Sequence, residues 1–360
     1  MKERRRVAQR VGQLLTIGFK GTELTPFVRD FLGKREGGGV ILFSRNLGNA
    51  EEILDLNREA REAAASVPPY RMVDQEGGPV MRLRNVATPL PPMGKIGELP
   101  GVHGARRAGK ILGRELRALG FNVNCAPVLD VHSNPDNPII GERAFSENAT
   151  RVGALGEAFI RGIQAMGVLA CGKHFPGHGD TNLDSHLALP TLEHDLERLR
   201  EVELVPFRHV IQSAPPALMM TAHIVFPKLD PDHPATLSSR VIPELLRQEL
   251  KFGGVVVSDD LEMAAIDDRY PMEEVIRLGL GADIDVFLIC HEEWKQQVAL
   301  ETLEKLVMDG DVPVERIERS LRRIHRTKSA FQSLPQADPK DLETLLCQTD
   351  DMSWVRGFGG

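Results

Sequence analysis

The chain has 360 residues, of which 42% are hydrophobic and 26% are charged, and its formal net charge is -7 at pH 7. This apolar content is enough to bury a large core, and the acidic balance argues against nucleic-acid binding as the main function. The length would allow two domains, but α/β barrels of this size commonly form one.

The N-terminal stretch MKERRRVAQRVGQLLTIGF begins with basic residues. Its apolar part is too short and too interrupted for a membrane span, and it lacks a small-residue cleavage site. No CxxC motif occurs among the four cysteines, which predicts buried reduced thiols at Cys125, Cys171, Cys290 and Cys347. We therefore expect a cytoplasmic monomer with no nucleic-acid or membrane partner.

Short apolar runs, many of them β-branched, alternate with helix-like segments along the chain. The runs are 16–19, 39–43, 70–73, 122–131, 168–174, 217–226, 253–260 and 285–290, and the helix-like segments are 49–65, 102–119, 150–166, 194–213, 238–250, 271–281 and 292–308. Several runs lack apolar/polar alternation, as is typical of strands covered on both faces. The order predicts an α/β fold, a (β/α)8 TIM-like barrel in one domain, with a doubly wound sheet as the alternative.

Polar residues recur where these runs end, which favours the barrel because the carboxyl ends of its strands meet on one face. Any one of them could instead cap the next helix; together they are Arg45, Asn46, Asp74, Asp130, Lys173, His174, His223 and Asp259. The barrel is expected over residues 1–335. The remainder, 336–360, has no strand signal and ends in glycines, which predicts a short C-terminal helix and a tail.

The stretch KHFPGHGDTNLDSH, residues 173–186, gathers three histidines and two aspartates. A zinc site could use His174, His178, His186 and Asp184, but Pro176 and a glycine between the first two histidines disfavour a helix that would align them. Acid/base chemistry fits better, since a carboxylate two residues from an imidazole can orient the ring and favour its protonated form. From the DSH tripeptide alone, a simple helix cap stays open.

The run VVVSDDLEM, residues 255–263, places two carboxylates where a strand ends. Only one of Asp259 and Asp260 can point to the barrel axis, because side chains alternate along a strand. A carboxylate facing an acid/base group across a pocket is the arrangement of a retaining glycosidase.

Six stretches of the chain match a specific family in that family's order. They are GGGVILFSRN (37–46), VDQEGGPVMRL (73–83), PVLDVHSNPDNPIIGERAFSEN (127–148), GKHFPGHGDTNLDSH (172–186), MMTAHIVFP (219–227) and GGVVVSDDLEM (253–263). On these residues the chain resembles the β-N-acetylglucosaminidase branch of glycoside hydrolase family 3. The resemblance spans residues of about 10 to about 330, nearly the whole chain.

The resemblance implies a metal-free and cofactor-free retaining enzyme. It would release terminal, non-reducing β-linked N-acetylglucosamine from muropeptides during cell-wall recycling. The small carbohydrate substrate would be an N-acetylglucosaminyl-anhydromuramyl peptide or a chitooligosaccharide. It assigns the nucleophile to Asp259 and the acid/base dyad to Asp184 and His186. The sugar-binding residues that it implies are Asp74, Arg82, Arg143, Lys173 and His174.

The DSH motif separates this branch from the similar β-glucosidases, which take their acid from a second domain. A deprotonated histidine is neutral and repels an incoming anion less than a carboxylate would. A β-N-acetylglucosaminide phosphorylase is therefore the alternative within the enzyme class, and a zinc-dependent barrel hydrolase is the alternative of a different class. One departure from the expected pattern is the pair Asp283 and Asp285, which falls where a buried strand should begin.

Overall fold

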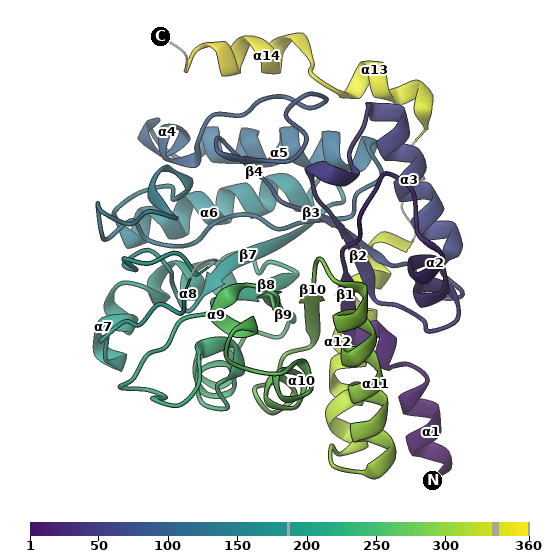
Figure 1. The fold of residues 1–360 in the computed structure, drawn as a ribbon. Coiled ribbons are helices and arrows are strands. Elements are labelled where there is room, and N and C mark those ends of the chain that lie inside the picture. Colours follow the sequence, from purple (N-terminus) through teal and green to yellow (C-terminus); the bar gives the residue numbers. More distant parts are fainter. Residues whose placement is uncertain (186–187, 333–337, 359–360) are drawn as a thin grey trace.

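The computed structural model describes residues 1–185, 188–332 and 338–358, with the backbone alone for 330–332. Its parallel strands close into an eight-stranded barrel in the order β1-β10-β9-β8-β7-β6-β3-β2 (Figure 1). The strands are β1 (Leu15–Ile17), β2 (Gly39–Leu42), β3 (Tyr70–Val73), β6 (Val123–Asn124), β7 (Leu169–Phe175), β8 (Leu218–Thr221), β9 (Val255–Asp260) and β10 (Val286–Ile289). Each overlaps one of the predicted runs, so the predicted barrel is confirmed and the doubly wound alternative is wrong.

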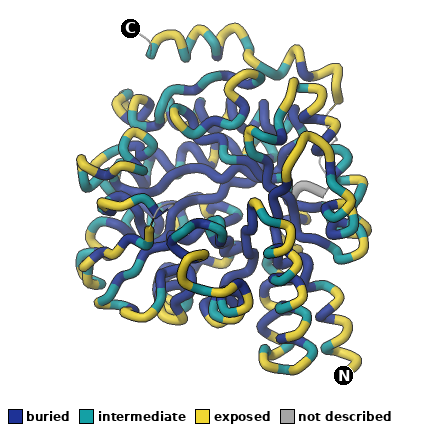
Figure 2. Tube along the Cα trace, viewed as in Figure 1, coloured by how far each residue is buried: buried dark blue, intermediate teal, exposed yellow. Residues whose placement is uncertain are grey.

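The barrel strands are apolar along their length because both of their faces are covered. Val255, Val256 and Val257 of β9 are each 0% exposed, so neither side of that strand reaches water. Figure 2 shows the same dark-blue interior along the other central strands. Burial on both faces explains why these runs lack the two-residue alternation of a half-exposed strand.

Helices cover the outside of the barrel. The main ones are α3 (Ala50–Ala63), α5 (His103–Ala118), α6 (Ala149–Gln164), α10 (Met272–Gly281), α11 (Glu293–Asp309) and α12 (Val314–Gln332). Their ends follow local chemistry: α3 begins with a capping box in which Asn49 and Glu52 bond each other's backbone N–H groups. Within the described residues, no helix has both the length and the apolar composition needed to cross a lipid bilayer.

Two predicted helices differ from the expectation, and each contains a proline. The segment 194–213 forms two helices, α7 (Leu196–Glu201) and α8 (Leu204–Ser213), because Pro206 cannot donate the bond that would continue the first helix into the second. The segment 238–250 forms a π-helix, η5 (Val241–Glu249), with Pro243 in its first turn. Its wider turns close with bonds such as that from Leu250 N to Leu245 O.

The two ends of the chain pack on the outer helices. At the N-terminus, α1 (Lys2–Ala8) lies beside α11, and the Arg4 guanidinium donates to Met308 O at 3.3 Å (Figure 1). Near the C-terminus, 336–360 contains α13 (Leu342–Leu345) and α14 (Thr349–Arg356) rather than one helix. Asp351 of α14 pairs with Arg107 and Arg114 of α5 at 3.1 and 2.8 Å. The segment is therefore docked onto α5, whereas the predicted boundary at 335 lies outside the described residues.

The remaining elements are short and lie in the connections. They are α2 (Pro26–Gly33), α4 (Met93–Glu98), α9 (Ala264–Asp267), the hairpin β4 (Gln75–Gly77) and β5 (Val80–Met81), and the 3₁₀ turns η1 (Val11–Leu14), η2 (Ser44–Asn46), η3 (Gly141–Arg143), η4 (Ala235–Leu237) and η6 (Pro339–Asp341). The hairpin follows β3 directly, so it lies at the carboxyl end of the barrel.

A charged cluster closes the opposite end of the barrel and explains the unusual aspartates before β10. Asp285 is 0% exposed and pairs with Arg247 at 2.6 Å and Arg323 at 2.9 Å, while Ser320 donates its hydroxyl to the same carboxylate. Asp283 pairs with both arginines at 2.9 Å. A buried carboxylate is tolerated where cations and donors satisfy all its lone pairs.

The cluster predicts a large cost for neutralising Asp285. Asp285→Asn would remove the buried negative charge that Arg247 and Arg323, both partly buried, share with Asp283, and we expect the free energy of unfolding to fall by about 3–5 kcal/mol. Asp55→Asn is the control, because the exposed pair of Asp55 with Arg58 should contribute less than about 1 kcal/mol. Urea denaturation of both variants measures the difference, and equal losses would contradict a structural role for the cluster.

Candidate active site

The polar residues at the carboxyl ends of the strands do gather at one end of the barrel. Asp74 follows β3, Lys173 and His174 lie in β7, and Asp259 is the last residue but one of β9. Lys173 joins two of these ends directly, because its Nζ lies 2.8 Å from Asp74 Oδ1. The barrel thus brings together residues that are 99 positions apart in the sequence.

A buried network of charges surrounds Lys173. Its ammonium also pairs with Glu76 Oε1 at 2.6 Å, and Glu76 in turn binds Arg143 through two bonds of 2.8 Å. Arg82 reaches the other oxygen of Asp74 at 3.9 Å. Four of the five predicted sugar-binding residues, Asp74, Arg82, Arg143 and Lys173, therefore meet in one network. Sequence reasoning did not single out Glu76, although its position two residues after Asp74 was a usable signal.

A second network is centred on Asp130, which is 0% exposed. Its Oδ2 lies 2.6 Å from His174 Nδ1, and its Oδ1 accepts the backbone N–H of His178 at 2.7 Å. Burial would raise the pKa of Asp130, but the neighbouring His174 and His178 hold that pKa below its usual range. The carboxylate stays ionised and fixes the orientation of the His174 ring.

Asp259 and Asp260 have different surroundings. Asp260 accepts the N–H groups of Glu262 at 3.1 Å and Cys290 at 3.3 Å, so its carboxylate is engaged by the loop and by the end of β10. Asp259 accepts from the Asp260 N–H at 2.8 Å. Removal from water would raise the pKa of Asp259, but the nearby charges of His174, His223 and Lys173 outweigh burial and lower it. Asp259 is therefore an ionised carboxylate at this end of the barrel.

The segment that carries Asp184 is anchored to the same networks. Ser185 is 3% exposed, its Oγ lies 3.2 Å from His178 Nε2, and its carbonyl accepts the N–H of Ala265 at 3.3 Å. Asp184 is partly buried, and its carbonyl accepts the N–H of Ala188 at 3.0 Å. The predicted acid/base residue His186 lies outside the described residues.

Among the described residues, the ring nitrogens of His174 and His178 do not form the start of the zinc set considered above. His178 uses both of its nitrogens, with Thr181 Oγ1 at 2.7 Å from Nδ1 and Ser185 Oγ near Nε2, and His174 Nδ1 faces Asp130. Both histidines are therefore held as members of hydrogen-bond networks rather than aimed at a shared point.

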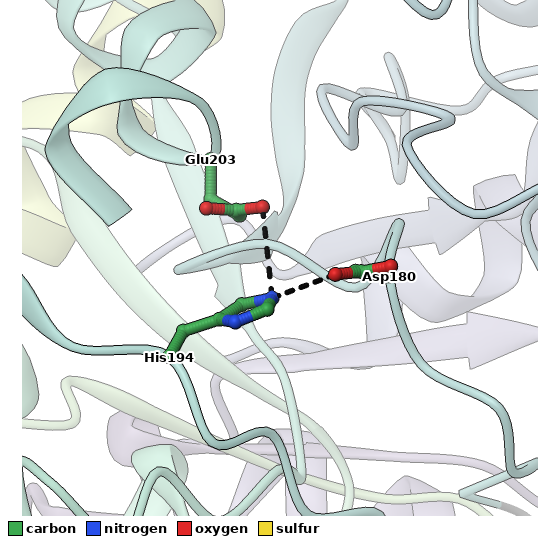
Figure 3. Close-up of side chains that lie close together, drawn as sticks. All are labelled: Asp180, His194 and Glu203. Atoms are coloured by element: carbon green, nitrogen blue, oxygen red, sulfur yellow. Dashed lines mark ion pairs between the residues drawn. The ribbon is translucent and has the colours of Figure 1, made fainter. Parts of the chain in front are cut away.

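Another set of potential metal ligands does occur in the described part of the chain. His194 lies between Asp180 and Glu203, with its Nε2 2.8 Å from one carboxylate and 4.0 Å from the other (Figure 3). The Arg198 guanidinium lies 3.0 Å from Glu203 and 3.6 Å from Asp180, so a cation already balances both carboxylates. The cluster instead ties together the two ends of the segment that contains Asp184.

Comparisons with known proteins agree on the family. The profile described as "Glycosyl hydrolase family 3 N terminal domain" matches residues 6–327. A β-hexosaminidase of Pseudomonas aeruginosa is 38% identical over 92% of this chain and 96% of its own length. The β-hexosaminidase A of Pseudoalteromonas piscicida is 37% identical, and the matched region spans just over half of that relative, 56%.

A solved structure extends the likeness to the fold. The family 3 β-N-acetylglucosaminidase of Paenibacillus sp. str. FPU-7 superposes with a TM-score of 0.92 at 41% identity, over 98% of this chain and 68% of that one. The described barrel is thus similar to the barrel of an experimentally determined relative along almost its entire length.

The buried position of His178 predicts a pH-dependent stability. Burial, followed by the charge of His174, lowers the pKa of His178 to about 4, from an ordinary value of 6.5. The unfolded chain therefore binds a proton that the folded chain resists, and this stability, fully present above pH 6.5, is lost as the pH falls toward 4.

The loss attributable to this residue should be about 3 kcal/mol. Urea unfolding at pH 7 and pH 4 gives the fall in the free energy of unfolding for the unmodified protein and for His178→Gln. The fall should be smaller by this amount in His178→Gln, which lacks the titrating ring. The control His103→Gln, at an exposed histidine, should leave the pH dependence as it is in the unmodified protein. Equal pH dependence in all three proteins would mean that His178 already ionises normally in the folded state.

Proposed function

The chain belongs to glycoside hydrolase family 3, and on this premise we propose that it is a retaining β-N-acetylhexosaminidase. Its substrate would carry a terminal, non-reducing β-linked N-acetylglucosamine. The observation that carries the proposal is the position of Asp259, an ionised carboxylate at the carboxyl end of β9 near His174, His223 and Lys173. The hexosaminidase names of the relatives support the choice of sugar.

In the proposed mechanism, an oxygen of Asp259 attacks the anomeric carbon while the bond to the leaving oxygen breaks. His186, protonated and oriented by Asp184, gives its proton to that oxygen. A covalent glycosyl–aspartate forms, and His186 then takes a proton from the water that releases the sugar. Two displacements at the same carbon return the product to the β configuration. The lowered pKa of Asp259 suits a nucleophile that must be ionised at neutral pH.

Substrate binding is assigned to the charged network beside Asp259. Asp74 would accept hydrogen bonds from sugar hydroxyls, and Arg82, Arg143, Lys173 and His174 would donate to hydroxyls and to the acetamido group. The Asp74 side chain is 16% exposed, so the network still opens to the solvent where a sugar would enter. Fixed, buried donors of this kind can recognise a neutral sugar without first reorganising.

The biological substrate would be an N-acetylglucosaminyl-anhydromuramyl peptide, processed in the cytoplasm as part of peptidoglycan recycling. This assignment rests on the resemblance of the six motifs to the muropeptide-processing branch of the family. A chitooligosaccharide offers the same terminal sugar to the same site, so the two differ only in the group that leaves.

The two adjacent aspartates make a matched test of the nucleophile. Asp259→Asn should lower kcat by roughly 10⁴-fold or more, because the amide cannot form the covalent intermediate. Asp260→Asn should stay within about tenfold of the unmodified enzyme, since its amide oxygen can still accept from Glu262 N and Cys290 N. Steady-state kinetics on an aryl β-N-acetylglucosaminide measures both variants, and the reverse order of activities would refute the assignment.

A substrate panel tests the class of reaction. In phosphate-free buffer, we expect turnover of an aryl β-N-acetylglucosaminide and none of the matching β-glucoside, which lacks the acetamido group. Chelator should leave this turnover unchanged, because the proposed chemistry uses only side chains. Activity that disappears with chelator would favour the zinc-dependent alternative. Repeating the assay in phosphate buffer separates the remaining two possibilities, since a phosphorylase would accumulate the sugar 1-phosphate and a hydrolase would release the free sugar.

A further inference from the structure

Glu76 is a buried carboxylate in the site to which neither the motifs nor the mechanism above gives a role. It lies in β4, in the hairpin that follows β3, and its side chain is 1% exposed. Asp74, two residues earlier, is 16% exposed and is reached by Lys173 at 2.8 Å and by Arg82 only at 3.9 Å. A substrate can therefore touch Asp74, whereas Glu76 is covered by the protein.

Within the described part of the chain, the polar contacts of the Glu76 side chain are with two cations of the site, Arg143 and Lys173. Its Oε2 accepts from Arg143 Nε at 2.8 Å, and its Oε1 accepts from Arg143 Nη2 at 2.8 Å and from Lys173 Nζ at 2.6 Å. The two bonds to Arg143 form the bidentate pair that fixes both the position and the plane of a guanidinium. One carboxylate thus holds two of the proposed sugar-binding side chains at once.

Counting donors shows what remains for a ligand. A guanidinium has five N–H donors, and Arg143 uses two on Glu76 and one on Ile139 O at 3.0 Å. An ammonium has three, and Lys173 uses one on Asp74 and one on Glu76. Among the partners that the described residues provide, Arg143 keeps two donors and Lys173 keeps one. The bonds that Arg143 and Lys173 make with Glu76 determine which of their N–H groups remain for a ligand.

Glu76 also balances the charge of this network. Lys173 is 3% exposed and Arg143 has a side-chain exposure of 12%, so two cations lie in a site with little water. Burial raises the pKa of Glu76, but Arg143 and Lys173 outweigh it and hold that pKa well below the usual range. Its negative charge is therefore present at every pH at which the enzyme would work, and it reduces the repulsion between the two cations.

We propose that Glu76 is a positioning residue for the sugar: it does not touch the substrate, but holds Arg143 and Lys173 so that their three remaining N–H donors face a bound N-acetylglucosamine. The inference rests on the proposed function, because it concerns how that sugar is held. Fixing these two side chains before the ligand arrives removes the entropy cost of ordering them during binding.

The test compares two buried glutamates that are each replaced by glutamine. Glu76→Gln keeps the shape of the side chain but turns one accepting oxygen into an N–H₂ group that cannot bond Arg143 or Lys173. Glu115→Gln is the control: Glu115 is 1% exposed and bonds Thr88 N at 2.9 Å and Cys347 N at 2.9 Å, in the outer layer formed by α5. Both variants lose one buried charge, and only the first loses it in the proposed site.

The readout is the inhibition constant of free N-acetylglucosamine, together with KM and kcat on the aryl N-acetylglucosaminide. We expect Glu76→Gln to raise the inhibition constant and KM roughly 10- to 100-fold, as losses of supporting residues do at other preorganised sites, and to lower kcat less. Glu115→Gln should lower the melting temperature and leave the inhibition constant within about twofold of the unmodified enzyme. An unchanged inhibition constant in Glu76→Gln, or equal rises in both variants, would overturn the proposal.

A double-mutant cycle with Arg143→Met shows whether Glu76 acts through the cations. If it does, adding Glu76→Gln to Arg143→Met should raise the inhibition constant by much less than the same change does in the unmodified enzyme. Full additivity would overturn the positioning role.

Should Glu76→Gln not fold, Glu76→Asp is the second variant, because it keeps the charge but is too short for the bidentate pair. An inhibition constant like that of the unmodified enzyme would then overturn the proposal. Failure of the unmodified protein to bind or hydrolyse the sugar is a separate result, which would refute the proposed function itself.

Discussion

Closure of the parallel sheet is the constraint on which the rest of the structure depends. β1 pairs with β10 on one side and with β2 on the other, so the first strand of the chain joins the last. Once all the strands run in the same direction around a closed barrel, their carboxyl ends must meet on one face. Asp74, Lys173 and Asp259 come from three different strand ends, and closure of the barrel places them at the same end of the molecule. The proposed chemistry is possible only because of this convergence.

The two ends of the barrel handle buried charge differently. At the amino end, the Asp285 carboxylate is surrounded by Arg247, Arg323 and Ser320, and its acceptor capacity is used within the protein. At the carboxyl end, Lys173 is paired with two carboxylates and still keeps a donor. A fully satisfied cluster suits stability, because no ligand can improve it. A cluster with donors left over gains bonds when a hydroxylated ligand arrives.

The segment that carries Asp184 illustrates how such a site can support a loop. Its first part is held by Ser185, which lies against His178, and its ends are joined by Asp180 and His194. The same His178 bonds Asp130 through its backbone N–H, so the loop and the strand-end network share a residue. In the proposed mechanism this loop brings the acid/base group to the sugar, and its anchoring to the strands of the proposed nucleophile and binding residues would make that placement more precise.

The sequence by itself determined the strands, most of the helices and the polar strand ends, because these follow from local patterns: apolar runs covered on both faces, caps and turn residues. It also carried the motifs that identify the family and the candidate residues Asp259, Asp184 and His186. The tertiary structure alone decided the pairings between distant positions. Glu76 and Arg143 are 67 residues apart, and no local rule reveals that one carboxylate would bind that guanidinium. Such partners are chosen by the order and register of strands around the barrel, which depend on the packing of the whole chain rather than on any one segment.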